Sequence, residues 1–94
     1  MIARITEHTQ LPDDLDPAYV ERHRAWLASQ PGFCGGYHLL EPETGHAISL
    51  ILWESREAIA AVAEARRRGE SPADGRISHE SQPRTRVVDV EAIF

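Results

Sequence analysis

The sequence is poor in cysteine, in aromatic residues and in long apolar runs. Its single cysteine, Cys34, cannot form an internal disulfide, so the chain is compatible with a reducing compartment. No apolar run approaches the roughly 18 to 20 residues of a membrane span, and the N-terminus lacks the basic and apolar regions of a secretory signal. We therefore expect a cytoplasmic protein that is not associated with a membrane.

Lysine and asparagine are absent, and the basic residues, all arginine, are outnumbered by acidic ones. Ten basic and 15 acidic residues give a formal net charge of -5. Negative charge repels a phosphate backbone, and the only dense basic cluster is the run of arginines at residues 66–68. We expect no nucleic-acid partner.

The chain is long enough to build one hydrophobic core. It has 94 residues, and a chain of this size needs neither disulfides nor metal to fold. The sequence contains no internal repeat, linker or low-complexity tract. We interpret residues 1–94 as a single domain.

The first part of the chain predicts a strand followed by a helix. Residues 1–9 alternate between two sides and contain β-branched residues, as in a strand. Asp16 and Pro17 are typical of a helix start, and residues 30–32, Gln-Pro-Gly, are typical of a helix end. Residues at three- and four-residue spacing predict a buried stripe on this helix: Tyr19, Val20, His23, Trp26 and Leu27.

The middle of the chain predicts a β-hairpin. A strand is expected over residues 33–40, where Gly35 and Gly36 indicate a bulge or the close approach of another backbone. Residues 41–45, Glu-Pro-Glu-Thr-Gly, suit a type I turn with a glycine bulge. The next strand, residues 46–53, is apolar on both of its sides.

The last part predicts a second helix and a fourth strand. Ser55 is a suitable N-cap, and Gly69 follows the arginines that favour a helix C-terminus. Residues 70–83 form a polar loop, and residues 84–94 alternate as a strand. The element order predicts an α+β fold of the ferredoxin-like βαββαβ type, with a four-stranded antiparallel sheet and two helices on one face.

The two-sided apolar character of residues 46–53 predicts a partner for the sheet. Two helices cover only one face of a four-stranded sheet, so the second face requires another apolar surface. Closed homodimers are the commonest oligomers, and we predict a homodimer formed through the sheet face.

Three segments carry a resemblance to a known family. They are Pro31-Gly32-Phe33, Gly35-Gly36-Tyr37 and the run Ser49-Leu50-Ile51-Leu52-Trp53-Glu54-Ser55. The chain resembles the dimeric α/β-barrel superfamily, and most of all the antibiotic-biosynthesis monooxygenase-like proteins. The resemblance implies a dimeric α/β barrel and, as an activity, cofactor-independent oxidation of a small aromatic molecule. Haem degradation, another activity in the superfamily, is disfavoured because the strand-one asparagine expected there is missing.

Aromatic and histidine side chains supply the candidate site. Tyr37 and Trp53 have the same strand parity as Ser49, and the simplest hairpin register places them on one face. A pocket between the first helix and the sheet would then hold an aromatic ligand, with His23 or His38 as a base near neutral pH. We predict three catalytic residues: His23, Tyr37 and Trp53. We predict four ligand-binding residues: Tyr19, Trp26, His38 and Ser49.

Plainer interpretations of the same residues stay open. Both tryptophans suit core positions, and His23 and His38 suit hydrogen-bonded structural positions. The five histidines form no pair at i,i+4 spacing and Cys34 has no cysteine partner, so we expect no metal site. His38 and His46 alone would lie diagonally across the hairpin. We expect no cofactor. The leading hypothesis is binding of a small hydrophobic or aromatic molecule by a cofactor-independent monooxygenase, and the alternative is a non-catalytic dimeric ligand-binding or accessory protein.

Overall fold

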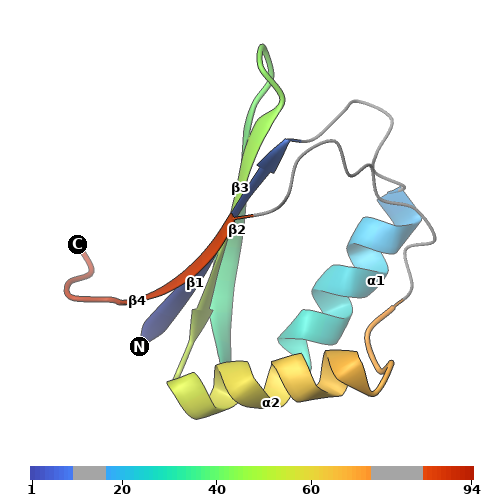
Figure 1. Ribbon diagram of the computed structural model, residues 1–94, viewed down its shortest axis with the longest axis vertical. Coiled ribbons are helices and arrows are strands. Elements are labelled where there is room, and N and C mark those ends of the chain that lie inside the picture. Colours follow the sequence, from blue (N-terminus) through green and yellow to red (C-terminus); the bar gives the residue numbers. More distant parts are fainter. Residues whose placement is uncertain (10–16, 73–83) are drawn as a thin grey trace.

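The sheet and its helices follow the order that the sequence predicts. The computed structural model describes residues 1–9, 17–72 and 84–94. The elements within them are β1 (Ile2–Thr9), α1 (Pro17–Ala28), β2 (Phe33–Glu41), β3 (His46–Trp53), α2 (Arg56–Arg67) and β4 (Arg84–Asp89). The strands form an antiparallel sheet in the order β2-β3-β1-β4, and both helices lie on one side of it (Figure 1). The ferredoxin-like α+β fold is confirmed.

Local side-chain and backbone chemistry sets the ends of the helices. Ser55 has extended backbone, and its hydroxyl accepts a hydrogen bond of 3.2 Å from the Ala58 N–H, which confirms the predicted N-cap of α2. After α1, Gly32 adopts a φ of +86°, a conformation that favours glycine. The predicted cap Asp16 lies outside the described residues, as do residues 11–15, residues 73–83 and His79.

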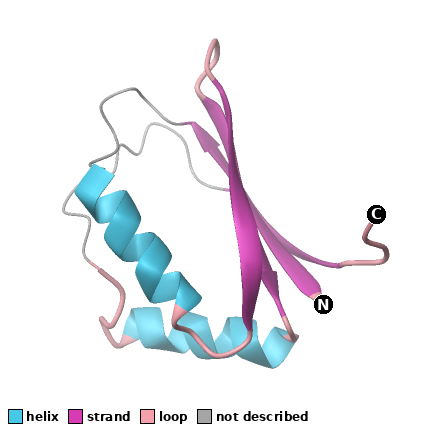
Figure 2. Ribbon diagram, turned by 180° about the vertical axis from the view of Figure 1, so that it is seen from behind, coloured by secondary structure: helices cyan, strands magenta, loops and turns pink. Residues whose placement is uncertain are grey.

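Strand register divides the sheet into two faces. β1 pairs Ile2 with Trp53 of β3, and every second residue from this pair lies on the same face. We call this the helix face, because Trp53 packs there against Leu27 of α1 and Val62 of α2. The opposite face, which we call the open face, is covered by none of the described elements (Figure 2).

The hydrophobic core lies between the helix face and the two helices. Leu27, Trp53 and Val62 are buried at its centre. Five partly buried residues pack against them: Trp26, Phe33, Ile51, Ala58 and Ile59. The stripe predicted on the first helix therefore contributes Trp26 and Leu27 to the core, whereas the side chain of Tyr19 is outside the description.

β2 contains the irregularity that its glycines indicate. The pairing with β3 shifts between Phe33 and Gly35, so Cys34 is an extra residue in a β-bulge, and Gly35 has a φ of +126°. At Gly36 an added Cβ would lie 2.7 Å from the backbone oxygen of Leu50 and 2.9 Å from the Ile51 Cδ1 atom. Both predicted reasons for the glycines are therefore present, the bulge at one and close approach at the other.

β4 is shorter than the sequence pattern predicts. Strand pairing ends at Asp89, which lies opposite Ile2, the first residue of β1. One further hydrogen bond joins the Val90 N–H to the Met1 carbonyl at 3.0 Å. The alternation that continues to Phe94 has no neighbouring strand to pair with, so residues 90–94 are not part of the sheet.

Candidate functional site

A small pocket lies between the helix face and the helices. The sheet contributes Arg4, Ile51 and Trp53, and the helices contribute apolar side chains and one arginine: Leu27, Ile59, Val62, Ala63 and Arg66. The cavity volume is about 40 Å³, which is enough for a few water molecules but not for an aromatic ring. A ligand of that size would require the helices to move away from the sheet.

Trp53 presents an unsatisfied donor at the wall of this pocket. Its side chain is 1% exposed and meets the Phe33 ring edge-on, with ring centroids 5.8 Å apart. The indole N–H has no hydrogen-bond partner among the described residues. Buried polar groups in folded proteins are nearly always paired, so an acceptor oxygen that entered the pocket would satisfy this donor.

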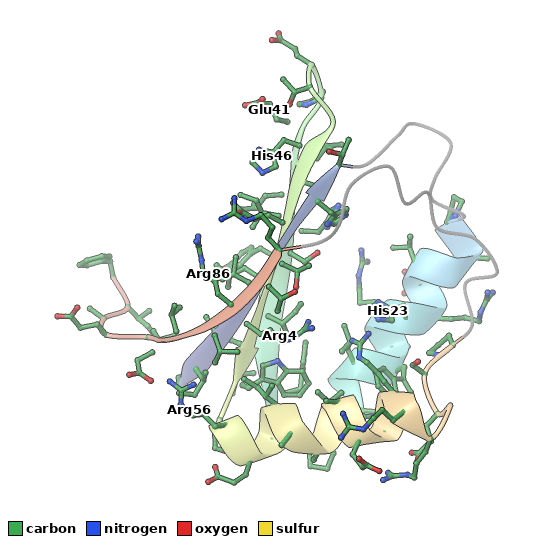
Figure 3. The ribbon with its side chains drawn as sticks, viewed as in Figure 1. Arg4, His23, Glu41, His46, Arg56 and Arg86 are labelled. Atoms are coloured by element: carbon green, nitrogen blue, oxygen red, sulfur yellow. The ribbon has the colours of Figure 1, made fainter. Side chains whose placement is uncertain are left out.

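Arg4 brings a charge into the same pocket. It lies on the helix face between Ile51 of β3 and Val87 of β4, and it is half-buried. Its Nη1 atom donates a hydrogen bond of 3.4 Å to Thr6 Oγ1, and within the described part of the chain it forms no ion pair. Figure 3 shows Arg4 on the side of the sheet that faces the helices, together with His23 of α1.

A polar row crosses the helix face beside Arg4. One residue from each strand takes part, in the spatial order Thr85, Thr6, Ser49, His38. The two threonine hydroxyls are 3.3 Å apart, and the Nδ1 atom of His38 is 3.2 Å from the Ser49 hydroxyl. We call these four residues the polar row. It provides hydroxyl and imidazole groups for hydrogen bonding on the helix face.

The surroundings of His38 favour its neutral form. Burial lowers the pKa of His38 below 6.5, and the positive charges of His8 and Arg24 lower it further. The His8 ring lies beside it, with centroids 6.1 Å apart. A neutral imidazole accepts a proton or a hydrogen bond at neutral pH, which is the property predicted for a base at this site.

Side chains of the two helices form a stack at the far side of the pocket. His23 lies against Trp26 with ring centroids 6.4 Å apart and planes at 21°. The guanidinium of Arg66 sits over the same Trp26 ring, 5.3 Å from its centroid. This stack connects α1 to α2 above the core.

The structure places most of the predicted site residues on one side of the sheet. Trp53, Ser49 and His38 lie on the helix face, Trp26 packs against the core, and His23 lies on the side of α1 that faces the sheet (Figure 3). Their proposed catalytic or binding roles stay predictions.

Tyr37 is on the wrong face for the predicted site. It pairs with Leu50, so it lies on the open face, opposite Trp53 and Ser49, and is 65% exposed. The hairpin loop causes this, because Glu41 pairs with His46 across four loop residues, and that register places odd positions of β2 opposite even positions of β3. The expectation that Tyr37 and Trp53 share a face is wrong.

The same register separates two histidines that the sequence suggested as a diagonal pair. His46 lies on the open face, 3.8 Å from the Glu7 carboxylate, whereas His38 lies on the helix face. Figure 3 shows His46 on the side of the sheet away from His23. In residues 1–9, 17–72 and 84–94, no group of three or more His, Cys, Asp or Glu side chains is placed to hold a metal ion.

Sequence reasoning missed the role of Arg4 and of the two threonines in the polar row. The alternation of residues 1–9 does place Ile2, Arg4, Thr6 and His8 on one side. An arginine on the side of a strand that carries a core-facing isoleucine was the available signal. The pattern does not show that Arg4 lacks an acidic partner in the part of the chain that the structure describes.

Comparison with known proteins shows similarity only at the level of structure. No protein-family model matches the sequence, and no curated protein matches it either. Rv0793 from Mycobacterium tuberculosis superimposes with a TM-score of 0.69 at 12% identity, covering 98% of this chain and 96% of its own. A monooxygenase from the gene ActVA-Orf6 of Streptomyces coelicolor, solved in complex with nanaomycin D, gives a TM-score of 0.57 at 14% identity. That match covers 99% of this chain and 89% of the monooxygenase.

Neither helix in the described ranges combines the length and the apolar character needed to cross a membrane.

The similarity to the two solved structures extends over nearly the whole chain, at an identity that carries fold and not activity. The resemblance drawn from the residues is confirmed at that level. The chain has the fold of Rv0793 and of the ActVA-Orf6 monooxygenase, which is the ferredoxin-like fold that the resemblance implies.

Proposed function

We propose that the protein binds a small hydrophobic or aromatic molecule between the helix face and the helices, and oxidises it as a cofactor-independent monooxygenase. The observation that carries the proposal is the buried indole N–H of Trp53, which has no partner among the described residues and lines an apolar pocket. A ligand oxygen at this position would pair the donor, while the apolar walls contact the rest of the ligand.

The proposed reaction converts a phenol to a quinone. One O₂ supplies the oxygen atom that is placed on the ring, and its second atom leaves as water with the hydrogens removed from the ring carbon and the hydroxyl. The substrate supplies all the electrons, so the reaction needs no external reductant. The work of the protein is to bind the ring, accept the phenolic proton and stabilise the resulting anion.

Among the described residues of the helix face, His38 is the one suited to accept that proton from an extended ligand. Ser49 and Trp53 are four residues apart along β3, which is about 13 Å at roughly 3.3 Å per residue. Because Ser49 holds His38, a single-ring phenol at the Trp53 N–H does not reach His38. The single hydroxyl of a probe such as 1-naphthol, bound at that N–H, therefore gives its proton to water, and His38 accepts a proton only from a ligand with a second hydroxyl at its far end.

We further propose that the protein works as a homodimer joined through the open face. That face carries apolar residues on all the strands, beside the charged residues Glu7, Arg84 and Arg86. The apolar residues are Ala3, Ile5, Tyr37, Leu39, Ile48, Leu50, Leu52 and Val88. Tyr37, Leu39 and Val88 are 65%, 48% and 39% exposed, so covering them with a second copy removes apolar area from water.

A non-catalytic binding protein is the second candidate function. The observation that favours it is the small cavity of about 40 Å³, since a pocket filled by its own side chains holds no preformed place for a substrate and oxygen together. Under this alternative the ligand binds but O₂ is not consumed.

The test uses 1-naphthol as the probe, with calorimetry for binding and an oxygen electrode for turnover. We expect binding and one O₂ consumed per naphthoquinone formed. Trp53→Phe removes the N–H, and we expect it to weaken binding about tenfold, in line with the loss of one hydrogen bond of roughly 1.4 kcal/mol. Trp26→Phe is the comparison variant: Trp26 belongs to the same core and to the predicted ligand-binding residues, but its N–H is not an unpaired buried donor, so this change should weaken binding less than Trp53→Phe.

The outcomes separate the two candidates. Binding of 1-naphthol without oxygen uptake would support the non-catalytic protein. Absence of binding, or equal effects of the Trp53→Phe and Trp26→Phe changes, would remove Trp53 from the site and contradict both.

A further inference from the structure

We propose that the pocket at Trp53 selects ligands that carry a carboxylate, and that Arg4 is the residue that binds it. The inference rests on the proposed function, because it names the chemical class of ligand for the same pocket. It is carried by the charge of Arg4 and by the donor groups that line the pocket with it.

Arg4 is a half-buried cation that forms no ion pair with any residue in the described ranges. Its neighbours in the sheet are the apolar residues Ile51 and Val87, and its single described hydrogen bond goes to the Thr6 hydroxyl. A guanidinium stays protonated at any pH a protein experiences. Removing such a charge from water without a counter-ion is costly, and a bound anion offsets the cost.

Within residues 1–9, 17–72 and 84–94, the helix face offers Arg4 no unpaired carboxylate. In the described strands its one carboxylate is Asp89, whose Oδ1 atom is 3.3 Å from Arg56 Nη2. Glu21 of α1 pairs with Arg24 at 3.5 Å. The remaining charged group at the pocket is a second arginine, Arg66, which lies over Trp26.

A carboxylate fits these donors better than a phenol does. The planar guanidinium fork matches the two oxygens of a carboxylate, and the Trp53 N–H supplies a further donor in the same pocket. A carboxylic acid with a pKa near 4 is fully ionised at neutral pH, whereas a phenol with a pKa near 10 is ionised to about one part in a thousand. The Thr6 hydroxyl, itself 3.3 Å from Thr85, holds the guanidinium on the pocket side.

The test compares 2-naphthoate with 2-naphthamide by calorimetry at neutral pH. The two probes share ring and shape and differ in charge. We expect wild-type protein to bind 2-naphthoate at least tenfold more tightly. Arg4→Met keeps much of the side-chain volume and should remove this preference by weakening the binding of 2-naphthoate at least tenfold more than that of 2-naphthamide.

Two further variants complete the design. Arg4→Lys keeps the charge without the fork and should retain a reduced preference, which also serves if Arg4→Met does not fold. Arg22→Met removes the same charge from an exposed position of α1 and should bind both probes as wild type does.

The possible results are distinguishable. Equal affinity of wild-type protein for the two probes would overturn the inference while leaving the proposed function standing, provided that 1-naphthol binds. If Arg4→Met still prefers 2-naphthoate to 2-naphthamide, another cation binds the carboxylate and the inference is wrong. If none of the aromatic probes binds, both the inference and the proposed function fail.

Discussion

His38 shows how its surroundings set the charge of a single residue on the helix face. Burial, His8 and Arg24 all disfavour its protonated form, and Ser49 holds the ring in place. The unfolded chain imposes none of these effects, so it binds a proton on this residue at a higher pH than the folded chain does. Folding stability is therefore linked to the protonation of His38.

We predict that the free energy of unfolding falls as the pH is lowered through 6.5 and on toward the lower pKa of folded His38. Well above pH 6.5 this residue is neutral in both the folded and the unfolded chain, so it does not change the free energy of unfolding. His38→Gln keeps a polar partner for Ser49 and cannot be protonated, so its urea unfolding curves should show a weaker loss between about pH 7.5 and about pH 5. A variant with the wild-type pH dependence would show that another group is responsible.

At the same scale, what the sequence predicts about the site depends on the residue. The core positions of Trp53 and Trp26 follow from spacing alone, because apolar periodicity reports burial. The position of Arg4 does not, since no acidic residue in the described ranges pairs with it, and only the packed structure shows this. Tyr37 is misplaced because parity depends on the length of a turn that sequence patterns specify poorly.

The connection between α1 and β2 shows how one element constrains the next. Gly32 follows α1, its carbonyl accepts a 2.8 Å hydrogen bond from the Glu54 N–H, and an added Cβ would lie 2.6 Å from the Ala58 Cβ atom of α2. Three elements therefore meet at a residue without a side chain. The close approach of α2 to the α1–β2 turn requires glycine there.

We predict that Gly32→Ala lowers the free energy of unfolding by about 3 kcal/mol, from backbone strain and from the contact with Ala58. Gly69→Ala is the matched control, because Gly69 also has positive φ, +80°, but no atom lies within 4 Å of its added Cβ. That control should cost only about 1 kcal/mol. Equal losses in urea unfolding would mean that the turn gives way easily and that α2 does not constrain it.

Element type and order follow from the sequence, while element ends follow from pairing. The predicted 46–53 strand matches β3 in full, and the Ser55 cap is where α2 begins. Residues 90–94 keep the alternation of a strand but have no pairing partner, so periodicity alone overestimates β4.

For the whole molecule, the open face is the feature that most needs a partner. Its apolar residues lie on all the strands, and His46 and Glu7, 3.8 Å apart, lie toward the hairpin end. Such a surface on a monomer would favour non-specific association. In a closed dimer, the open face of one copy would be covered by the open face of the other.

We predict that light scattering after size-exclusion chromatography gives about 21 kDa, twice the 10.5 kDa of one chain. Leu50→Glu places a charge on the open face and should shift the mass to that of the monomer. Ala60→Glu adds the same charge at an exposed position of α2 and should leave the dimer intact. A wild-type mass of one chain at micromolar concentration would contradict the dimer.

The bulge at Cys34 has a consequence for solubility. β2 is an edge of the sheet, and an edge strand exposes unpaired backbone groups to which a foreign strand can attach. The extra residue and the glycine at φ +126° interrupt the ladder near the start of β2, so an incoming chain finds no long, regular template there. The irregularity that shifts the register of the hairpin thereby acts against edge-to-edge aggregation.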